Sequence, residues 1–422
     1  MTRAQAVTAS LDPDAPLDDL EPLRDVIGDA RVVGIGESTH HAAEFYRMRH
    51  RLLRFLVERC GFTAYVFEAP FTEAHVIDDW VRGGPGDVAA VSSAGTALGL
   101  GDHPEMHAHL AWMRRHNERA ERPLRFVGAL PVSTGSPLPA LTEVERFLRR
   151  ADPDALPLLT QAVEVAERFD ADALRAFQRY AELDTADRDA ATAALSRLLA
   201  RMECMAAHHR SEGRGREHAA AVRHLRGAWH LDHFHRDLSG TGLAVGTAEL
   251  DRYAAETVLD VLAAEPRIVF AMHNTHLRRT PVEHEGALGL FPAGYHLAEA
   301  LGDDYVAIAA TSIGGRAVDG ALTPDGLETR EVPLPPLEPD CIETAFTGDA
   351  PLTISALRPE EGAYRRIRAE GGFMTAPISR AFDAIACVPT TSTQDDFSGV
   401  PVAAQLASSW SASAEGEPGS AV

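Results

Sequence analysis

Three titratable side chains follow two short apolar runs near the start of the chain. Glu37 and His40 come directly after residues 32–35, and Glu68 follows residues 65–67. An imidazole can take a proton from water at neutral pH, while a nearby carboxylate fixes its tautomer and stabilises the imidazolium. The sequence contains no Gly-x-Ser-x-Gly motif, which argues against a serine nucleophile of the α/β-hydrolase kind. We therefore predict chemistry that uses a histidine-activated water.

A second group of imidazoles follows an apolar run much later in the chain. His273, Asn274 and His276 come directly after residues 268–272. Parallel α/β sheets bind ligands outside the carboxyl ends of their strands, because the connecting loops converge there. We therefore expect both histidines to join the earlier carboxylates at one edge of a sheet. A second imidazole there can stabilise the oxyanion that forms when water attacks an acyl carbon.

The residues between Glu37 and Glu68 predict a strand, a helix and a second strand. Apolar side chains recur at helical spacing over residues 45–56, and Gly61 is well placed to end the helix. A right-handed crossover brings the carboxyl ends of both strands to the same edge. Arg49 lies inside this predicted helix, where it either supports the oxyanion or is an exposed, solubilising arginine.

Strands alternating with helices on both sides of a long helical stretch predict an α/β fold with a parallel-rich central sheet flanked by helices. A large all-α insertion is expected to form one wall of the active-site cleft. The predicted division has residues 1–136 and 236–391 as two parts of the core, 137–235 as the helical insertion and 392–422 as a disordered tail. Residues 83–101, rich in glycine and other small residues, predict a long loop.

Composition excludes several classes of protein. The net charge of −22 argues against nucleic acid and anionic membranes as partners. The basic residues are all arginine, so a Walker-type phosphate loop and a Schiff-base lysine are excluded. The first residues lack the features of a signal peptide, and no apolar run is long enough to span a membrane, which predicts a cytoplasmic protein. A small-molecule or modified-peptide substrate is the expected partner, and oligomeric state is left open.

Metal binding has two candidate places. His230, His233 and His235 are close in sequence, but their spacing does not hold all three on one helical face, and no carboxylate lies at obvious ligand spacing. Two histidines and two glutamates at the main cluster suit zinc or iron as well as direct acid–base chemistry. The prediction is that no cofactor is needed, with a metal at the main cluster as the open alternative.

Two motifs together carry a resemblance to the erythromycin esterase family. They are Gly36-Glu37-Ser38-Thr39-His40 and His273-Asn274-Thr275-His276, and the similarity keeps its order from about residue 16 to about residue 390. The resemblance implies ester hydrolysis of a macrolactone by activated water. It implies that His40 is the general base, that Glu37, Glu68 and His273 complete the essential set, and that Arg49 and His276 support it. His41, Glu44 and Asn274 are the further candidates for substrate binding.

The chain departs from the family pattern at several positions around these motifs. His41 stands where a glycine usually follows the motif histidine, Leu130 stands where aspartate is common, and Leu250 and Thr257 replace the usual arginine and asparagine. These departures predict an ester, lactone or amide substrate other than erythromycin, from a secondary-metabolite pathway. Two alternatives stay open: a tailoring enzyme for cyclisation, acyl transfer or elimination, and a non-catalytic binding protein on a decayed esterase scaffold.

Overall fold

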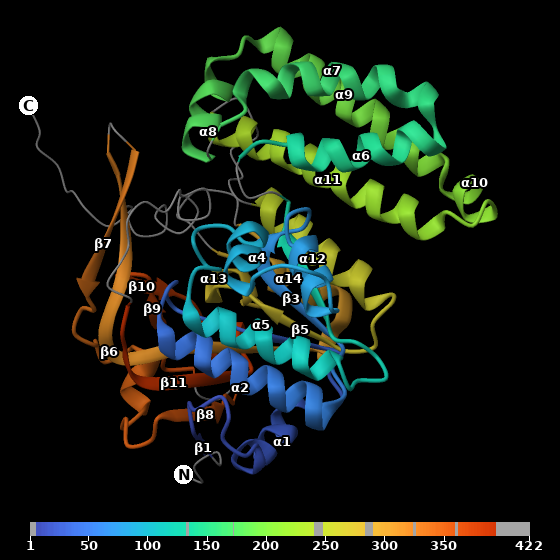
Figure 1. The fold of residues 1–422 in the computed structure, drawn as a ribbon. Coiled ribbons are helices and arrows are strands. Elements are labelled where there is room, and N and C mark those ends of the chain that lie inside the picture. Colours follow the sequence, from blue (N-terminus) through green and yellow to red (C-terminus); the bar gives the residue numbers. More distant parts are fainter. Residues whose placement is uncertain are drawn as a thin grey trace, which may run out of the picture. The chain divides into compact units, whose positions relative to one another are not determined.

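The structure is a computed structural model, and it describes residues 6–131, 135–171, 173–239, 248–282, 290–323, 326–358 and 362–393. A mostly parallel central sheet with helices around it is the main feature, which confirms the predicted fold class (Figure 1). The tail predicted for residues 392–422 lies outside the described residues from 394 onward. No helix in the described ranges combines the length and the hydropathy that a membrane span requires.

The central sheet has nine strands in the order β1-β8-β11-β6-β2-β5-β3-β4, with β7 paired to β6. Its strands are β1 (Val7–Ala9), β2 (Val32–Ile35), β3 (Ala64–Pro70), β4 (Arg125–Leu130), β5 (Ile268–Ala271), β6 (Tyr305–Thr323), β7 (Gly326–Pro333), β8 (Leu352–Ala356) and β11 (Ala384–Thr391). A separate antiparallel pair is formed by β9 (Arg366–Ala369) and β10 (Gly372–Thr375).

Parallel pairing dominates the middle of the sheet. Strand β6 pairs in parallel with β2 on one side and with β11 on the other, and β3 pairs in parallel with β4. Every residue of β2, β3 and β5 is buried, as expected for strands covered on both faces. Antiparallel pairs lie at the end formed by β11, β8 and β1. The carboxyl ends of β2 and β5 are therefore where loops and helix starts meet.

The chain divides into two compact units. Unit 1 comprises Met1–Phe62, Val269–Val282 and Leu297–Val422, and unit 2 comprises Thr63–Ile268 and Glu283–His296. The helices within unit 1 are α1 (Arg24–Ile27), α2 (Ala43–Cys60), α13 (Asn274–Leu277) and α15 (Ile378–Ala381), with short 3₁₀ turns at Asp18–Leu23, Gly302–Asp304 and Ile342–Ala345. Helix α14 (Ala293–Leu301) crosses the boundary between the units.

Unit 2 contains a long, purely helical stretch. Figure 1 shows α6 to α9 and α11 packed together as a bundle, and their apolar faces share one core that includes Val144, Leu159, Leu195 and Leu225. The helices of unit 2 are α3 (His75–Val81), α4 (Val88–Gly95), α5 (Pro104–Asn117), α6 (Leu138–Ala151), α7 (Leu156–Phe169), α8 (Ala173–Glu182), α9 (Thr185–Cys204), α10 (Ala206–Ser211), α11 (Gly215–Leu238) and α12 (Ala248–Leu262). A wall-forming role for this bundle stays a prediction.

One predicted loop is wrong in part. Residues 83–101 contain helix α4, which begins after Asp87 because the Asp87 carboxylate accepts hydrogen bonds from the N–H groups of Ala89 and Ala90. This N-cap satisfies amide groups that the first turn of a helix leaves without partners. The many small residues of the segment had suggested a flexible loop, although alanine favours helix.

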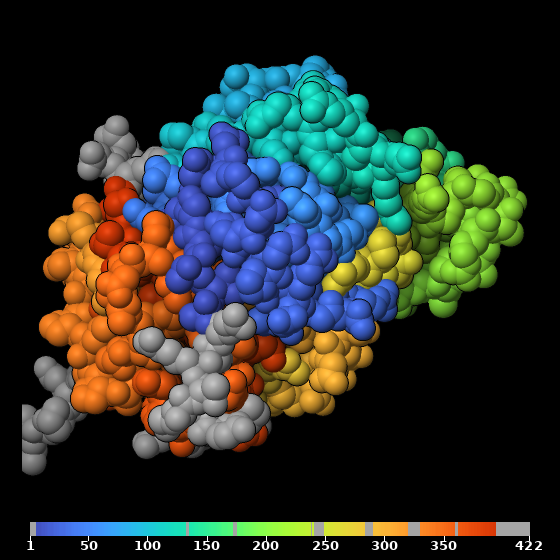
Figure 2. Space-filling model, turned by 90° about the horizontal axis from the view of Figure 1, so that it is seen from below, coloured from blue at the N-terminus to red at the C-terminus, as the bar shows by residue number. Residues whose placement is uncertain are grey.

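Unit 1 pairs early and late segments of the described chain. Strand β1, from the first residues, pairs antiparallel with β8 through Val7 and Ile354. Figure 2 shows the blue N-terminal residues beside the orange residues of the later chain. Near the end of the described chain, the Ala43 N–H donates to the Ser392 carbonyl. These pairings were not predicted, because each is between residues far apart in the sequence.

Candidate active site

The loop after β2 carries two of the predicted catalytic residues. Gly36 extends the pairing of β2 with β6, since its N–H donates to the carbonyl of Ile308 over 2.9 Å. The chain then leaves the sheet through residues 37–42 and enters α2 at Ala43. Glu37 is fully buried, and His40 is 4% exposed. The apolar strand and the following helix thus place a carboxylate and an imidazole together inside the protein.

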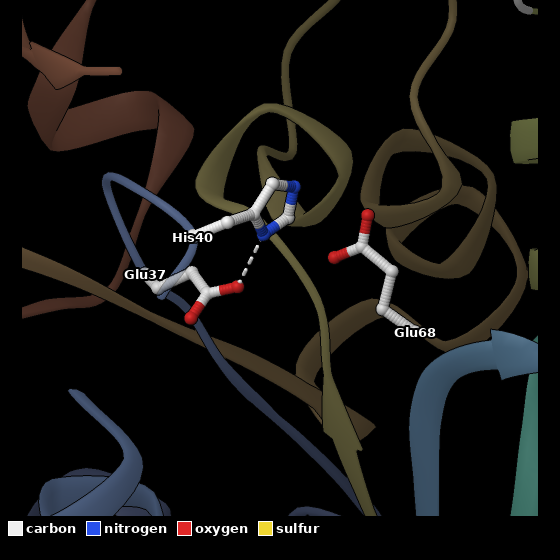
Figure 3. Close-up of side chains that lie close together, drawn as sticks. All are labelled: Glu37, His40 and Glu68. Carbon is white, nitrogen blue, oxygen red and sulfur yellow. Dashed lines mark hydrogen bonds and ion pairs between the residues drawn. The ribbon is translucent and has the colours of Figure 1, made fainter. Parts of the chain in front are cut away.

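Glu37 connects His40 to Arg49. His40 Nδ1 lies 2.8 Å from Glu37 Oε1 (Figure 3), and Arg49 Nη1 lies 2.8 Å from Glu37 Oε2. Arg49 is 1% exposed, which rules out the alternative of a solubilising surface arginine. Its Nη2 also donates to the carbonyl of Met272, at the end of β5. The carboxylate therefore receives one partner at each oxygen.

Glu37 is held as an anion. Burial opposes its ionisation, but the Arg49 guanidinium and the hydrogen bond from His40 outweigh this effect and lower the pKa of Glu37 to about 2. An ionised carboxylate only accepts hydrogen bonds, so the shared proton belongs to His40 Nδ1. Nε2 of His40 is then the basic nitrogen. This is the tautomer that a general base needs.

His273 has the opposite tautomer. Its side chain caps the short helix α13, where Nδ1 accepts a hydrogen bond from the N–H of Thr275 over 3.3 Å. A nitrogen that accepts carries no proton, so the proton of neutral His273 lies at Nε2. The ring centroids of His40 and His273 are 5.5 Å apart. One proton acceptor and one hydrogen-bond donor thus lie side by side in unit 1.

His273 is held neutral. Burial is the largest effect, and with the nearby charge of His40 it lowers the pKa of His273 to about 3, although Glu37 acts in the opposite direction. A neutral imidazole donates a hydrogen bond without giving up its proton at neutral pH. His276 lies three residues later in α13 and is 9% exposed. Its nearby charge also lowers the pKa of His273. His273 therefore lies beside His40 of the first motif, and His276 lies near His273.

Three other predicted residues make well-defined contacts of their own. Asn274 donates to the carbonyl of Ala310 over 2.7 Å and accepts from the Ala310 N–H over 3.0 Å, which fixes α13 to β6. Glu44 accepts hydrogen bonds from the main-chain N–H and the hydroxyl of Ser392. His41 adopts a left-handed backbone with φ of 66°, and its ring is 6.2 Å from that of His40. Substrate contacts of these three stay predictions.

Glu68 lies on β3 in unit 2 and is 2% exposed. Figure 3 draws it with Glu37 and His40, and one ligand atom of each lies within 4.8 Å of the others. This is the one group of acidic, imidazole and thiol side chains in the described ranges that meets this criterion for a cation. The residue types suit zinc or iron, as the sequence had suggested.

Sequence reasoning missed one carboxylate at the cluster. Glu370 lies at the turn between β9 and β10, and its Oε1 is 3.4 Å from His273 Nε2. Its Oε2 accepts a hydrogen bond from Thr39 Oγ1 over 3.0 Å. The signal was present in the pair of glycines after Glu370, which favours a tight hairpin turn. Nothing local indicates which distant residues such a turn meets.

The second candidate metal place makes a contact that the sequence spacing does not indicate. A carboxylate does accompany the histidine run, because His230 Nδ1 lies 2.6 Å from Glu249 Oε2 on α12. No local pattern indicates this contact, since the two residues lie on different helices. His235 instead uses its Nε2 to donate to the carbonyl of Gly135 over 2.7 Å. These contacts give His230 and His235 structural partners within unit 2.

Comparisons with known proteins agree with this fold. The model of the erythromycin esterase family matches residues 57–391. Erythromycin esterase type II of Escherichia coli is 31% identical over 394 residues, which cover 88% of this chain and 92% of that protein. Erythromycin esterase type I of Escherichia coli is 27% identical over 390 residues, with 88% and 93% covered.

A solved structure shows the same fold. A mutant of the erythromycin esterase EreC in its open conformation superposes with a TM-score of 0.81 at 24% identity, covering 94% of this chain and all of that one. Fold and matched relatives together place the protein among the esterase-type hydrolases. The chain belongs to the erythromycin esterase family.

Proposed function

We propose that this protein hydrolyses an ester or lactone bond of a natural-product-like substrate, with water activated by His40. One observation supports this most strongly: His40 donates through Nδ1 to an ionised Glu37, which leaves Nε2 as the basic nitrogen. Nε2 takes a proton from water as the water oxygen attacks the acyl carbon. Glu37 stabilises the imidazolium that results, and Arg49 keeps Glu37 ionised.

His273 has a matching role in this proposal. As a neutral imidazole with its proton at Nε2, it donates a hydrogen bond to the oxygen that becomes negatively charged. Removing one such donor typically slows a reaction by about 10² to 10³ fold. Glu68 completes the set as the carboxylate that exchanges protons with water or with the leaving alcohol. His276 adds a further imidazole beside His273.

The chemistry proposed here uses no metal. Both oxygens of Glu37 already have partners, a histidine N–H at one and a guanidinium at the other. A cation bound to this carboxylate would have to displace the His40 proton and lie close to the positive charge of Arg49. Exhaustive treatment with EDTA and with 1,10-phenanthroline is expected to leave kcat unchanged. Loss of activity that zinc or iron restores would replace this proposal with metal-assisted hydrolysis.

A substrate other than erythromycin is part of the proposal. His41 is buried beside His40 where relatives in the family usually have glycine, so it takes up space next to the base. Leu130 ends strand β4 as a buried apolar residue where aspartate is common, and the Thr257 hydroxyl donates to the carbonyl of Tyr253 within α12. Altered size and polarity at these positions favour an ester, lactone or amide of different shape from erythromycin.

The decisive experiment is a hydrolysis screen in ¹⁸O-labelled water. Lactones, thioesters and amides are incubated with the protein, with His40→Ala, and with the control His208→Ala, which changes an exposed histidine of α10. We expect one ¹⁸O atom in the acid product, a kcat about 10² to 10⁴ fold lower for His40→Ala, and normal turnover for the control. Glu68→Gln is expected to lower kcat as well, as His40→Ala does.

Two other outcomes support the alternatives. Turnover without ¹⁸O incorporation indicates cyclisation, acyl transfer or elimination on the same imidazole and carboxylate groups. Tight binding without turnover indicates a binding protein. The intact hydrogen bond between Glu37 and His40, with Arg49 in place, favours catalysis over a decayed scaffold.

A further inference from the structure

Glu370 lies at the tip of a hairpin that reaches the loop carrying His40. The backbone of Glu370 is left-handed, with φ of 47°, a conformation that residues other than glycine seldom adopt. Its N–H donates to the carbonyl of Ser38 over 2.6 Å. Strain of this kind persists only where surrounding contacts hold it, and it is concentrated at functional sites. The hairpin tip is therefore fixed against residues next to His40.

The side chain of Glu370 contacts both halves of the site. Oε2 accepts a hydrogen bond from Thr39 Oγ1 over 3.0 Å, and Oε1 lies 3.4 Å from Nε2 of His273. The Glu370 side chain is 13% exposed and that of His273 is 2% exposed, so the pair is largely shielded from water. One carboxylate thus links the loop after β2 to the residue that follows β5.

The strand that leads to the hairpin tip is also held firmly. Arg368 on β9 donates through Nε to the carbonyl of Ser312 and through Nη2 to the carbonyl of Ile313, both over 2.9 Å. The N–H of Arg368 donates to Glu343 Oε1 over 2.8 Å. These bonds tie β9 to β6, the strand beside β2. Glu370 therefore projects from a rigid support and not from a loose loop.

We propose that Glu370 is a positioning residue for His273. Thr275 keeps the His273 proton at Nε2. Glu370 Oε1 lies 3.4 Å from that nitrogen, outside the range of a strong hydrogen bond, so the carboxylate attracts the ring without taking the donor that the oxyanion needs. Glu370 thereby sets the rotation of the ring, as Glu37 does for His40. Through Thr39 and Ser38 it also fixes the distance between the two imidazoles. The inference rests on the proposed function, because it concerns the residue proposed to donate to the oxyanion.

The test measures the histidine signals by NMR and, in a separate experiment, kcat and KM. Protein with ¹⁵N-labelled histidine is compared as wild type, Glu370→Ala, Glu370→Gln and the control Glu338→Ala. Glu338 is about half exposed and forms a salt bridge with Arg366 of the same hairpin. The chain has 19 histidines, so the His273 signals are assigned by their disappearance in His273→Gln.

We expect Glu370→Ala to shift the Nε2–H signal of His273 and to lower kcat by about 10² fold, with KM changed less than about twofold, because a misplaced group near the chemistry has an effect of this size. Removing the negative charge also lowers the pKa of the imidazoles that face it, so the acid limb of the kcat/KM profile moves to lower pH. Glu37, His40 and His276 face His273 in every variant. Glu370→Gln is expected to recover part of kcat, since its amide oxygen still accepts the hydrogen bond from Thr39 Oγ1.

Unchanged His273 signals in Glu370→Ala overturn the inference, whatever happens to kcat. If Glu370→Ala does not fold, Glu370→Gln is judged by the same signals. A shift equally large in Glu338→Ala also overturns it, because it shows only a general loosening of the hairpin. A shifted His273 signal in a protein that hydrolyses none of the screened compounds leaves the positioning inference standing and refutes the proposed function alone.

Discussion

Arg49 Nη1 lies 2.8 Å from Glu37 Oε2, and both side chains are almost completely removed from solvent. Arg49 also donates to the carbonyl of Met272, so one guanidinium bridges the loop after β2 and the end of β5. A buried charge is costly unless a partner neutralises it. The ionised state of Glu37, and with it the tautomer of His40, depends on this pair.

Arg49→Met is expected to destabilise the protein by about 3 to 5 kcal/mol, because it leaves a buried carboxylate without its cation. The pKa of Glu37 rises, and kcat falls with it. Urea-induced unfolding monitored by tryptophan fluorescence measures the stability. Arg47→Met, an exposed position on the same helix, is the control and is expected to change stability by less than about 0.5 kcal/mol. A loss equal to that of the control would contradict the role given to Arg49.

Stability is expected to fall as the pH is lowered from about 6.5. Folding lowers the pKa of His273 from 6.5 to about 3, and burial does the same to His224 in unit 2. Below pH 6.5 the unfolded chain therefore binds protons that the folded protein does not, and stability is lost until the folded pKa is reached. Glu37 adds to this below pH 4.5, since its folded pKa is about 2.

Urea unfolding at a series of pH values tests this slope. We expect the free energy of unfolding to be flat above about pH 7 and to fall steadily below it. His273→Gln and His224→Gln, which cannot bind a proton, are each expected to reduce the slope between pH 6.5 and 4.5. A slope unchanged in both variants would show that these histidines are not held neutral by folding.

Gly36→Ala is expected to disturb the site without touching a catalytic group. A Cβ at Gly36 would collide with Oδ1 of Asn274, whose amide is already fixed on both sides by the main chain of Ala310. We expect a stability loss of about 1 to 3 kcal/mol and a clear fall in kcat. Gly314→Ala, where an added Cβ meets no atom within 4 Å, is the matched control. Thermal melting and steady-state kinetics measure both.

His41→Gly is expected to broaden the range of substrates. The change removes a buried ring beside His40 and places glycine in a left-handed backbone, which glycine adopts without strain. We expect higher kcat/KM for bulkier lactones, including macrolactones, and little change for small esters. A panel of lactones of increasing ring size measures this. Equal changes in kcat/KM across the panel would show that His41 does not set specificity.

Sequence alone determined the parts of this protein that local patterns encode. Apolar runs predicted β2, β3 and β5, helical periodicity predicted α2, and the residues that follow the strands indicated where chemistry belongs. The fold class and the family followed from these patterns. Each is a property of neighbouring residues, since strand and helix periods are read over a few residues.

Only the tertiary structure decided which partner each group meets. In the folded protein Arg49 contacts Glu37, and the Asn274 amide bonds to the main chain of Ala310. The Glu370 carboxylate contacts His273 and Thr39. These pairs join residues far apart in the chain, and no short-range pattern records them. The tautomers of the two imidazoles depend on such partners, because each ring nitrogen donates or accepts according to what lies beside it. The position of Glu370 beside His273 and Thr39 is likewise known only from the folded structure.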